Sequence, residues 1–224
     1  MAIKSARTNH KLGNRFSIWN RSLGAAANFG AVGSIVGSLG IFANARSLSE
    51  ATTDASAITS SNALPILAAL MGIFFLGVGT LWFSAAMMGF GFRAAQFVRE
   101  RGATTRWRPG WAIGAWFVPI LSQFVPLLIF RDIVSATKAA TSEATQRSLL
   151  WFWIWWVVLS GLANTTVSSL QSPSHATVYS GLTMLAGVMC FHVVPFMMGK
   201  KLFKTIDADL RAMELSAPVA GTTA

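Results

Sequence analysis

The chain alternates long apolar stretches with short polar segments, and five of the stretches reach membrane-spanning length. They cover residues 23–44, 63–92, 111–130, 149–167 and 178–198. A helix rises about 1.5 Å per residue and must cross a hydrocarbon core of about 30 Å, so roughly 17 to 25 residues make one span. The pattern therefore predicts an all-α, multi-pass integral membrane protein.

Two prolines interrupt the third apolar stretch, residues 111–130. Neither Pro119 nor Pro126 has an amide hydrogen to donate to the carbonyl four residues earlier, so a continuous helix is weakened twice. Ser122 and Gln123 lie between them and offer polar partners for a turn at membrane depth. The segment is predicted either to re-enter and return to the side it left, or to cross as a kinked span.

The positions of the cations distinguish these topologies. The chain has 18 Lys and Arg residues, and such residues are enriched in cytoplasmic loops. If all five stretches cross from a cytoplasmic N-terminus, 10 cations lie inside and 8 outside. If 111–130 crosses and 149–167 does not, 14 cations lie inside and 4 outside. If 111–130 re-enters, the numbers are 17 and 1. The count favours four transmembrane helices plus a proline-broken segment, with both termini cytoplasmic; five spanning helices are the alternative.

The polar segments define the remaining organisation. Residues 1–22 are a basic leader, predicted to be an interfacial helix or a disordered tail, and residues 23–205 a single membrane domain. The Ser- and Thr-rich stretch 45–62 is predicted to be a flexible exposed loop. Gly102 is predicted to end the helix that continues from the second stretch. Residues 206–224 form a cytoplasmic tail with a disordered end.

The first apolar stretch raises the question of a cleaved signal peptide. Ala43, Asn44 and Ala45 have the small-x-small pattern of a cleavage site. The apolar part is nevertheless longer than the 7 to 15 residues of a typical signal core. We therefore expect a retained first span.

Small residues concentrate in that first span, where Gly33 and Gly37 form a GxxxG pair. Such pairs let helix backbones approach closely in a bilayer, where lipid supplies no hydrophobic drive between helices. The pattern predicts packing against other spans of the same chain, with dimerisation as the alternative.

Composition adds few candidates for chemistry. All eight acidic residues lie outside the spanning stretches, which disfavours a proton-coupled carrier, and the single Cys190 excludes an internal disulfide. The cations flank the spans instead of gathering on a soluble face, so nucleic acid is not expected as a partner. No nucleophile motif, phosphate loop or metal-ligand spacing occurs. We predict no catalytic residue, no cofactor, no metal and no enzymatic activity.

His192 is the ionisable side chain inside a span. An intramembrane histidine can ligate a metal or haem, or form a hydrogen bond between helices. Suitable companion ligands are lacking, so we predict a hydrogen bond, with the carbonyl freed by Pro195 as a candidate acceptor.

Aromatic and basic clusters mark the ends of the later spans. We interpret the tryptophans of the fourth stretch as an interfacial belt, with a surface for lipid, quinone or a partner helix as the alternative: Trp151, Trp153, Trp155 and Trp156. The cations that follow the last span are predicted to attract anionic lipid at the cytoplasmic face: Lys200, Lys201 and Lys204.

Part of the chain is similar to a known family. The sequence PGW at 109–111, WFVPI at 116–120 and Pro126 resemble an uncharacterised bacterial membrane family, domain of unknown function 4328 (DUF4328). The resemblance extends to the order of apolar stretches over residues 60–205 and to the Trp-rich fourth stretch. It implies the architecture and leaves the function open.

The chain departs from that family at two points. Ser122 stands where the family tends to have Asn, and Val-Pro-Leu at 125–127 where it tends to have Arg-Pro-Tyr. Any family site that uses those polar groups is therefore altered in this chain.

From these features we predict a structural, accessory or interaction subunit of a complex in the bacterial plasma membrane. The alternative is a channel or transporter for a small solute, with the proline-broken segment lining its path. Expected partners are bilayer lipid, anionic lipid at the cytoplasmic face, and other membrane subunits or further copies of the chain.

Overall fold

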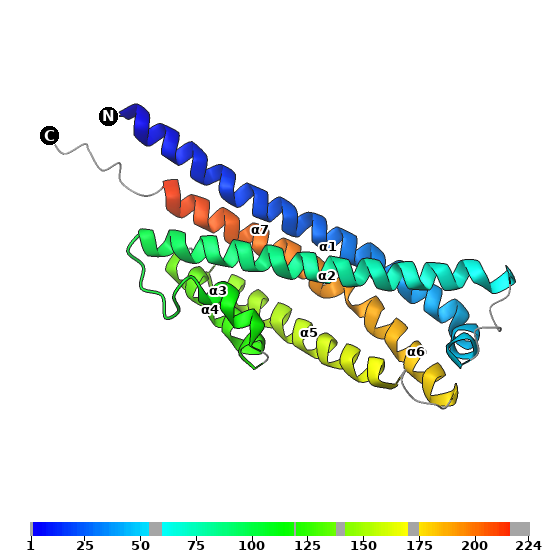
Figure 1. Cartoon of the computed structure of the whole chain (residues 1–224). Helices are drawn as coiled ribbons and strands as arrows, with labels where there is room; N and C mark the ends of the chain where they lie inside the picture. Colours follow the sequence, from blue (N-terminus) through cyan, green and yellow to red (C-terminus); the bar gives the residue numbers. More distant parts are fainter. Residues whose placement is uncertain (1, 54–59, 119, 138–141, 170–174, 216–224) are drawn as a thin grey trace. The chain divides into compact units, whose positions relative to one another are not determined.

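The computed structural model describes residues 2–53, 60–118, 120–137, 142–169 and 175–215. All regular elements in this part are helical (Figure 1). They are α1 (Ala2–Thr53), α2 (Ser60–Glu100), α3 (Trp111–Gly114), the short 3-10 helix η2 (Ala115–Phe117), α4 (Leu121–Thr137), α5 (Ser142–Ser169), α6 (His175–Phe191) and α7 (Val193–Leu215).

Four helical segments of the described part are long and apolar enough to cross a membrane. They are Ile18–Glu50 in α1, Ile66–Glu100 in α2, Ser142–Thr166 in α5, and Thr177–Leu215, which combines α6 and α7. The third apolar stretch of the sequence is not among them. The prediction of an all-α protein with four spans and a broken fifth segment is therefore confirmed.

The chain divides into two compact units. Unit 1 consists of residues 1–24, 84–151 and 200–224, and unit 2 of residues 25–83 and 152–199. Helices α1, α2 and α5 contribute residues to both units, as does α7.

Close approach of two backbones organises unit 2. A Cβ on Gly33 of α1 would lie 2.6 Å from the backbone nitrogen of Leu76, and one on Gly79 of α2 would lie 2.5 Å from Cα of Gly30. Gly37 faces Gly72 in the same way. The glycine stripe of the first span is therefore occupied by α2 of the same chain, at a separation that only residues without a side chain allow.

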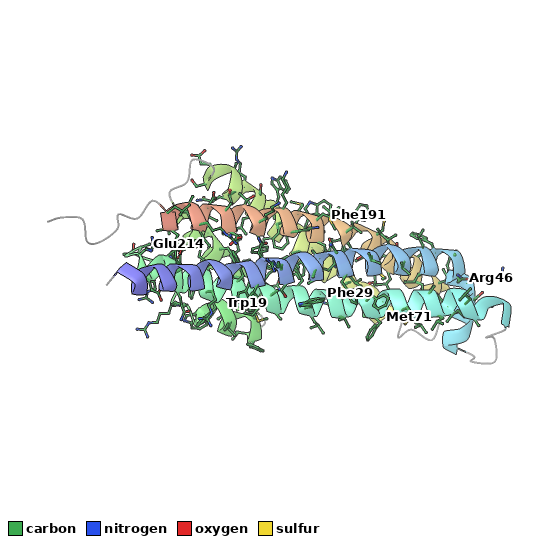
Figure 2. All side chains as sticks on the ribbon, turned by 90° about the horizontal axis from the view of Figure 1, so that it is seen from above. Trp19, Phe29, Arg46, Met71, Phe191 and Glu214 are labelled. Carbon is green, nitrogen blue, oxygen red and sulfur yellow. The ribbon has the colours of Figure 1, made fainter. Side chains whose placement is uncertain are left out.

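Aromatic rings fill the space beside this contact. Phe29 of α1 meets Phe75 of α2 edge to face at 5.0 Å (Figure 2). The fully buried Phe83 packs against Phe196 at 5.5 Å and against Trp156 at 5.6 Å. Such ring pairs add about 0.5–1.5 kcal/mol each beyond the area they bury.

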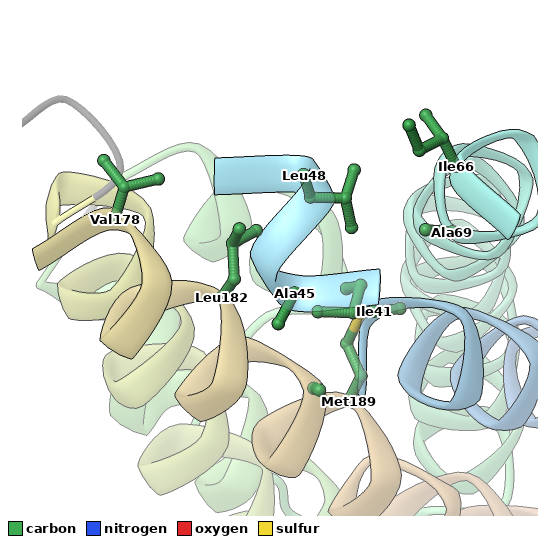
Figure 3. Packing of buried hydrophobic residues seen from close by; sticks show 9 residues of the cluster. Ile41, Ala45, Leu48, Ile66, Ala69, Val178, Leu182 and Met189 are labelled. Carbon is green, nitrogen blue, oxygen red and sulfur yellow. The ribbon is translucent and has the colours of Figure 1, made fainter. Parts of the chain in front are cut away.

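A second cluster of unit 2 overturns the prediction of a flexible loop after residue 44. Helix α1 continues to Thr53, interrupted only in backbone angles at Asn44 (φ −134°, ψ 20°). Beyond this point Ala45 and Leu48 are buried in a cluster with Val178, Leu182 and other residues of α2 and α6 (Figure 3). The predicted loop was wrong for residues 45–53, because two apolar side chains at helical spacing pack there; residues 54–59 lie outside the described part.

The predicted leader and the predicted tail both contain parts of long helices. The backbone of α1 is helical from Ala2, so the leader is helical and not a disordered tail. Its interfacial position stays a prediction. Helix α7 runs into the predicted tail as far as Leu215, and residues 216–224 lie outside the described part.

In unit 1, α2 ends at Glu100, and Gly102 caps it, as predicted. Gly102 has a positive φ of 80°. Its amide donates to the carbonyl of Arg99 at 2.9 Å, and the amide of Ala103 donates to Val98 at 3.0 Å. This pair of bonds is a Schellman motif, whose left-handed residue is usually glycine.

Candidate functional site

The proline-broken segment forms a short helical piece, α3 with η2, and a longer helix, α4, joined by a turn. After α3 and η2 the backbone becomes extended at Val118 (φ −107°, ψ 112°), and α4 begins at Leu121. Both earlier pieces pack against α4, and all three belong to unit 1 (Figure 1). The residue before a proline is sterically driven out of the α region, so Val118 before Pro119 explains the position of the turn. Pro119 itself lies outside the described residues.

The turn precedes the position that the sequence suggested. The amide of Ser122 bonds to the carbonyl of Val118 at 2.8 Å and that of Gln123 to Ile120 at 3.3 Å, so both belong to the first turn of α4. They lie directly after the break, and their role as polar partners for the turn stays a prediction. Pro126 does not break the helix: it lies inside α4 as a buried residue.

Aromatic contacts hold this helical pair in unit 1. Phe130 of α4 packs against Phe203 of α7 at 5.1 Å and stacks on Phe90 of α2 at 6.5 Å. A Cβ on Gly91 would touch Phe130 at 3.1 Å and the side chain of Ala112 at 3.7 Å. Helices α2 and α7 therefore cover this part of α4, whereas the residues at the break are exposed: Phe117 76%, Val118 42% and Ile120 74%.

Most Lys and Arg residues whose side chains are described belong to unit 1, which also contains the proline-broken segment. Of the 13 Lys and Arg residues whose side chains are described, only Arg46 belongs to unit 2. The other 12 belong to unit 1, among them the exposed Lys200, Lys201 and Lys204. Segment 111–130 belongs as a whole to this same unit.

Asp207 is a buried acid that the sequence did not reveal. Its side chain on α7 is only 5% exposed. Oδ2 accepts a hydrogen bond from Asn20 of α1 at 3.1 Å and forms an ion pair with Arg211 at 3.1 Å, whereas Oδ1 has no hydrogen-bond partner. The signal available in the sequence was the apolar spacing of Phe203, Ile206 and Leu210, which places this face of α7 in a core.

His192 lies between α6 and α7 and is buried in unit 2. Its Nδ1 donates to the carbonyl of Val188 at 2.8 Å, one turn earlier in the same helix. The predicted hydrogen bond between helices was therefore wrong. Pro195 lacks the amide that would bond to Phe191, which explains why the last span changes from α6 to α7 at this point.

The tryptophans of α5 do not form a uniform interfacial belt. Trp151 is 58% exposed, whereas Trp153 is only 4% exposed. Trp156 packs against Phe83 and Phe152, and Trp155 stacks on Phe191 at 6.4 Å. The belt interpretation was wrong for Trp153, which is buried, whereas Trp156 is half-buried among these rings.

The described residues of unit 1 include the linings of two hollows. One is a groove of about 380 Å³ between α4 and α5, lined by Leu127, Leu128, Arg131, Glu143, Gln146, Arg147, Leu149 and Leu150. The other, of about 340 Å³, is lined by Gly102, Ala103, Thr104, Asp132, Ser135 and Ala136. Neither is lined by Ser122, Gln123 or His192. Within the described residues, no three His, Cys, Asp or Glu side chains gather closely enough to hold a metal ion.

Comparison with known proteins supports the resemblance stated above. The family model described as a domain of unknown function (DUF4328) matches residues 42–200, or 159 of the 224 residues. The match begins earlier than the resemblance over 60–205 suggested and includes the whole proline-broken segment. No curated protein and no solved structure matches the chain.

Proposed function

Because the chain belongs to the DUF4328 family, whose description assigns no activity, we propose its role from its own structure: a non-catalytic structural or interaction subunit of a membrane complex. The polar groups within its spans carry this proposal. In unit 2 the buried Ser34, Thr166 and His192 each bond to a carbonyl of the preceding turn, at 2.8 Å in every case.

Polar groups satisfied within their own helices favour a packed module. Passage of a solute or ion needs polar groups turned toward one another or toward water along a path. Here the space between α1 and α2 is closed by backbone contact, and that around Phe83 by aromatic rings. Large apolar side chains instead point outward, where they can meet lipid or a second membrane protein.

Site-specific photo-crosslinking in the native membrane tests this role. A photoreactive residue would be placed at outward-facing positions on four helices, with the buried Ala86 as control: Leu39, Leu81, Val158 and Met184. We expect protein adducts, to another protein or to a second copy, from one helix face and not from the others. Lipid adducts alone from all four positions would refute a subunit role.

The alternative, a channel or transporter for a small solute, has one supporting observation. The chain turns back between η2 and α4, and broken helices often line the paths of transport proteins. This role requires water at Ser122, Gln123 or His192. Cysteines at these positions should then react with water-soluble thiol reagents in a Cys190→Ser background; failure of all three to react contradicts transport along this segment.

We further propose a plasma-membrane location with both termini in the cytoplasm. The support is the concentration of described cations in unit 1. In intact cells, an impermeant thiol reagent should label Glu50→Cys in unit 2 and leave Glu143→Cys in unit 1 unlabelled. Labelling of Glu143→Cys from outside would overturn the re-entrant topology.

A further inference from the structure

The groove between α4 and α5 is apolar at one end and basic at the other. On α4, Leu127 and Leu128 precede Arg131 by about one turn, which is about 5 Å along the axis. On α5, Arg147 precedes Leu150 by three residues. In both helices the arginine lies nearer to the α4–α5 connection than the leucines do, so Arg131 and Arg147 line the same end of the groove.

Two further polar residues complete the basic end. Gln146 donates from Nε2 to Oγ of Ser135 at 3.0 Å, a bond that ties α5 to α4. Glu143 lies one helical turn before Arg147 and also lines the groove. The side chains that line the groove therefore carry two positive charges and one negative charge, a net charge of +1.

The shape and charge of this groove fit one chemical class of ligand. Its volume of about 380 Å³ falls in the range of small-molecule sites, about 300–1,000 Å³. Arginine binds phosphate oxygens through paired N–H groups, and leucines beside it offer an apolar surface to a hydrocarbon chain. The most abundant molecules with both parts around a membrane helix are phospholipids.

We propose that the groove is a binding site for a singly anionic glycerophospholipid. Its phosphodiester lies between Arg131 and Arg147, and one acyl chain runs along Leu127, Leu128 and Leu150. A head group with hydroxyls can donate a hydrogen bond to Glu143. The net charge of +1 at the site matches one lipid charge of −1, whereas a zwitterionic lipid leaves the site positive. This binding is independent of whether the protein serves as a complex subunit.

Lipid binding to the purified full chain tests the site. The delipidated protein in a neutral detergent would be titrated with phosphatidylglycerol, phosphatidylcholine, phosphatidylethanolamine or inorganic phosphate, and bound lipid counted by native mass spectrometry. Arg131→Gln and Arg147→Gln are the test variants. Arg99→Gln is the matched control, because Arg99 is an exposed helical arginine of unit 1 that does not line the groove.

We expect phosphatidylglycerol to bind more tightly than either zwitterionic lipid. Each test variant should weaken it about fivefold, the equivalent of about 1 kcal/mol per cation near a membrane surface, and Arg99→Gln should not. A Leu128→Ser variant should weaken binding of the lipid without changing the response to inorganic phosphate. Unchanged melting temperatures would show that the variants are folded.

Three results would overturn the proposal. One is equal loss of binding in Arg99→Gln and the groove variants, which would indicate a diffuse charge effect. Another is equal affinity for phosphatidylglycerol and phosphatidylcholine. The third is saturation by inorganic phosphate at the same concentration as by lipid, which would indicate an anion site with no role for the acyl chain.

Discussion

Two glycines of α2, two residues apart, should respond in opposite ways to the same substitution. Gly79 faces α1, where an added Cβ would lie 2.5 Å from Cα and 2.7 Å from the nitrogen of Gly30. Gly77 has nothing within 4 Å of the same hypothetical atom. The two glycine-to-alanine substitutions therefore add the same methyl group to the same helix. They differ only in the atoms that the added methyl group contacts.

The expected magnitudes follow from these distances. An ordinary contact begins at 3.4 Å, so Gly79→Ala must move the backbones of α1 and α2 apart by about 0.9 Å, because no flexible side chain can yield. Overpacking of this kind costs about 1–3 kcal/mol. Gly77→Ala should instead stabilise the helix by about 0.5–1 kcal/mol, because alanine loses less backbone entropy than glycine on folding. The two variants should differ by about 1.5–4 kcal/mol.

Thermal unfolding in detergent, followed by intrinsic fluorescence of the 9 tryptophans, measures this difference. At about 2–4 °C per kcal/mol for a chain of this size, Gly79→Ala should melt at least about 3 °C below Gly77→Ala. Gly72→Ala, which meets the backbone of Gly37, should behave like Gly79→Ala. Equal melting temperatures for the 77 and 79 variants would refute the view that backbone contact between α1 and α2 is close.

Three further substitutions test other contacts by the same melting assay. Gly102→Ala should destabilise the protein by about 1–2 kcal/mol, because φ is 80° and an L-residue is strained there. The control Gly110→Ala, at φ −58°, should be tolerated, and equal effects of the two substitutions would contradict the left-handed cap. Asp207→Ala should cost about 1–3 kcal/mol through loss of its charged hydrogen bonds, and an unchanged melting temperature would show that they contribute nothing. Phe83→Ala, fully buried, should cost about 3–5 kcal/mol, and Phe117→Ala, 76% exposed, far less; a reversed order would contradict the packing of unit 2.

Local chemistry was enough to predict much of the architecture. Apolar length identified five candidate spans, because a helix must match the thickness of the bilayer, and the cation count and the prolines singled out the four that helices of membrane-spanning length form. Gly102 marked the end of α2, since a left-handed cap selects glycine. The break near Pro119 was also foreseen, because a proline restricts the residue before it whatever surrounds the chain.

Other features depended on residues far away in the sequence. Pro126 carries the same local penalty as any helical proline, yet it is accommodated in α4, where its neighbours in the helix are buried. Trp156 was predicted at a lipid interface and instead meets Phe83 and Phe196, more than 35 residues away in either direction. Asp207 seemed to belong to a tail, and its burial follows from the approach of α1 and Asn20. In each case the environment is supplied by other helices, so only the tertiary structure, in which those helices meet, could decide which side chains are buried and which partners they find.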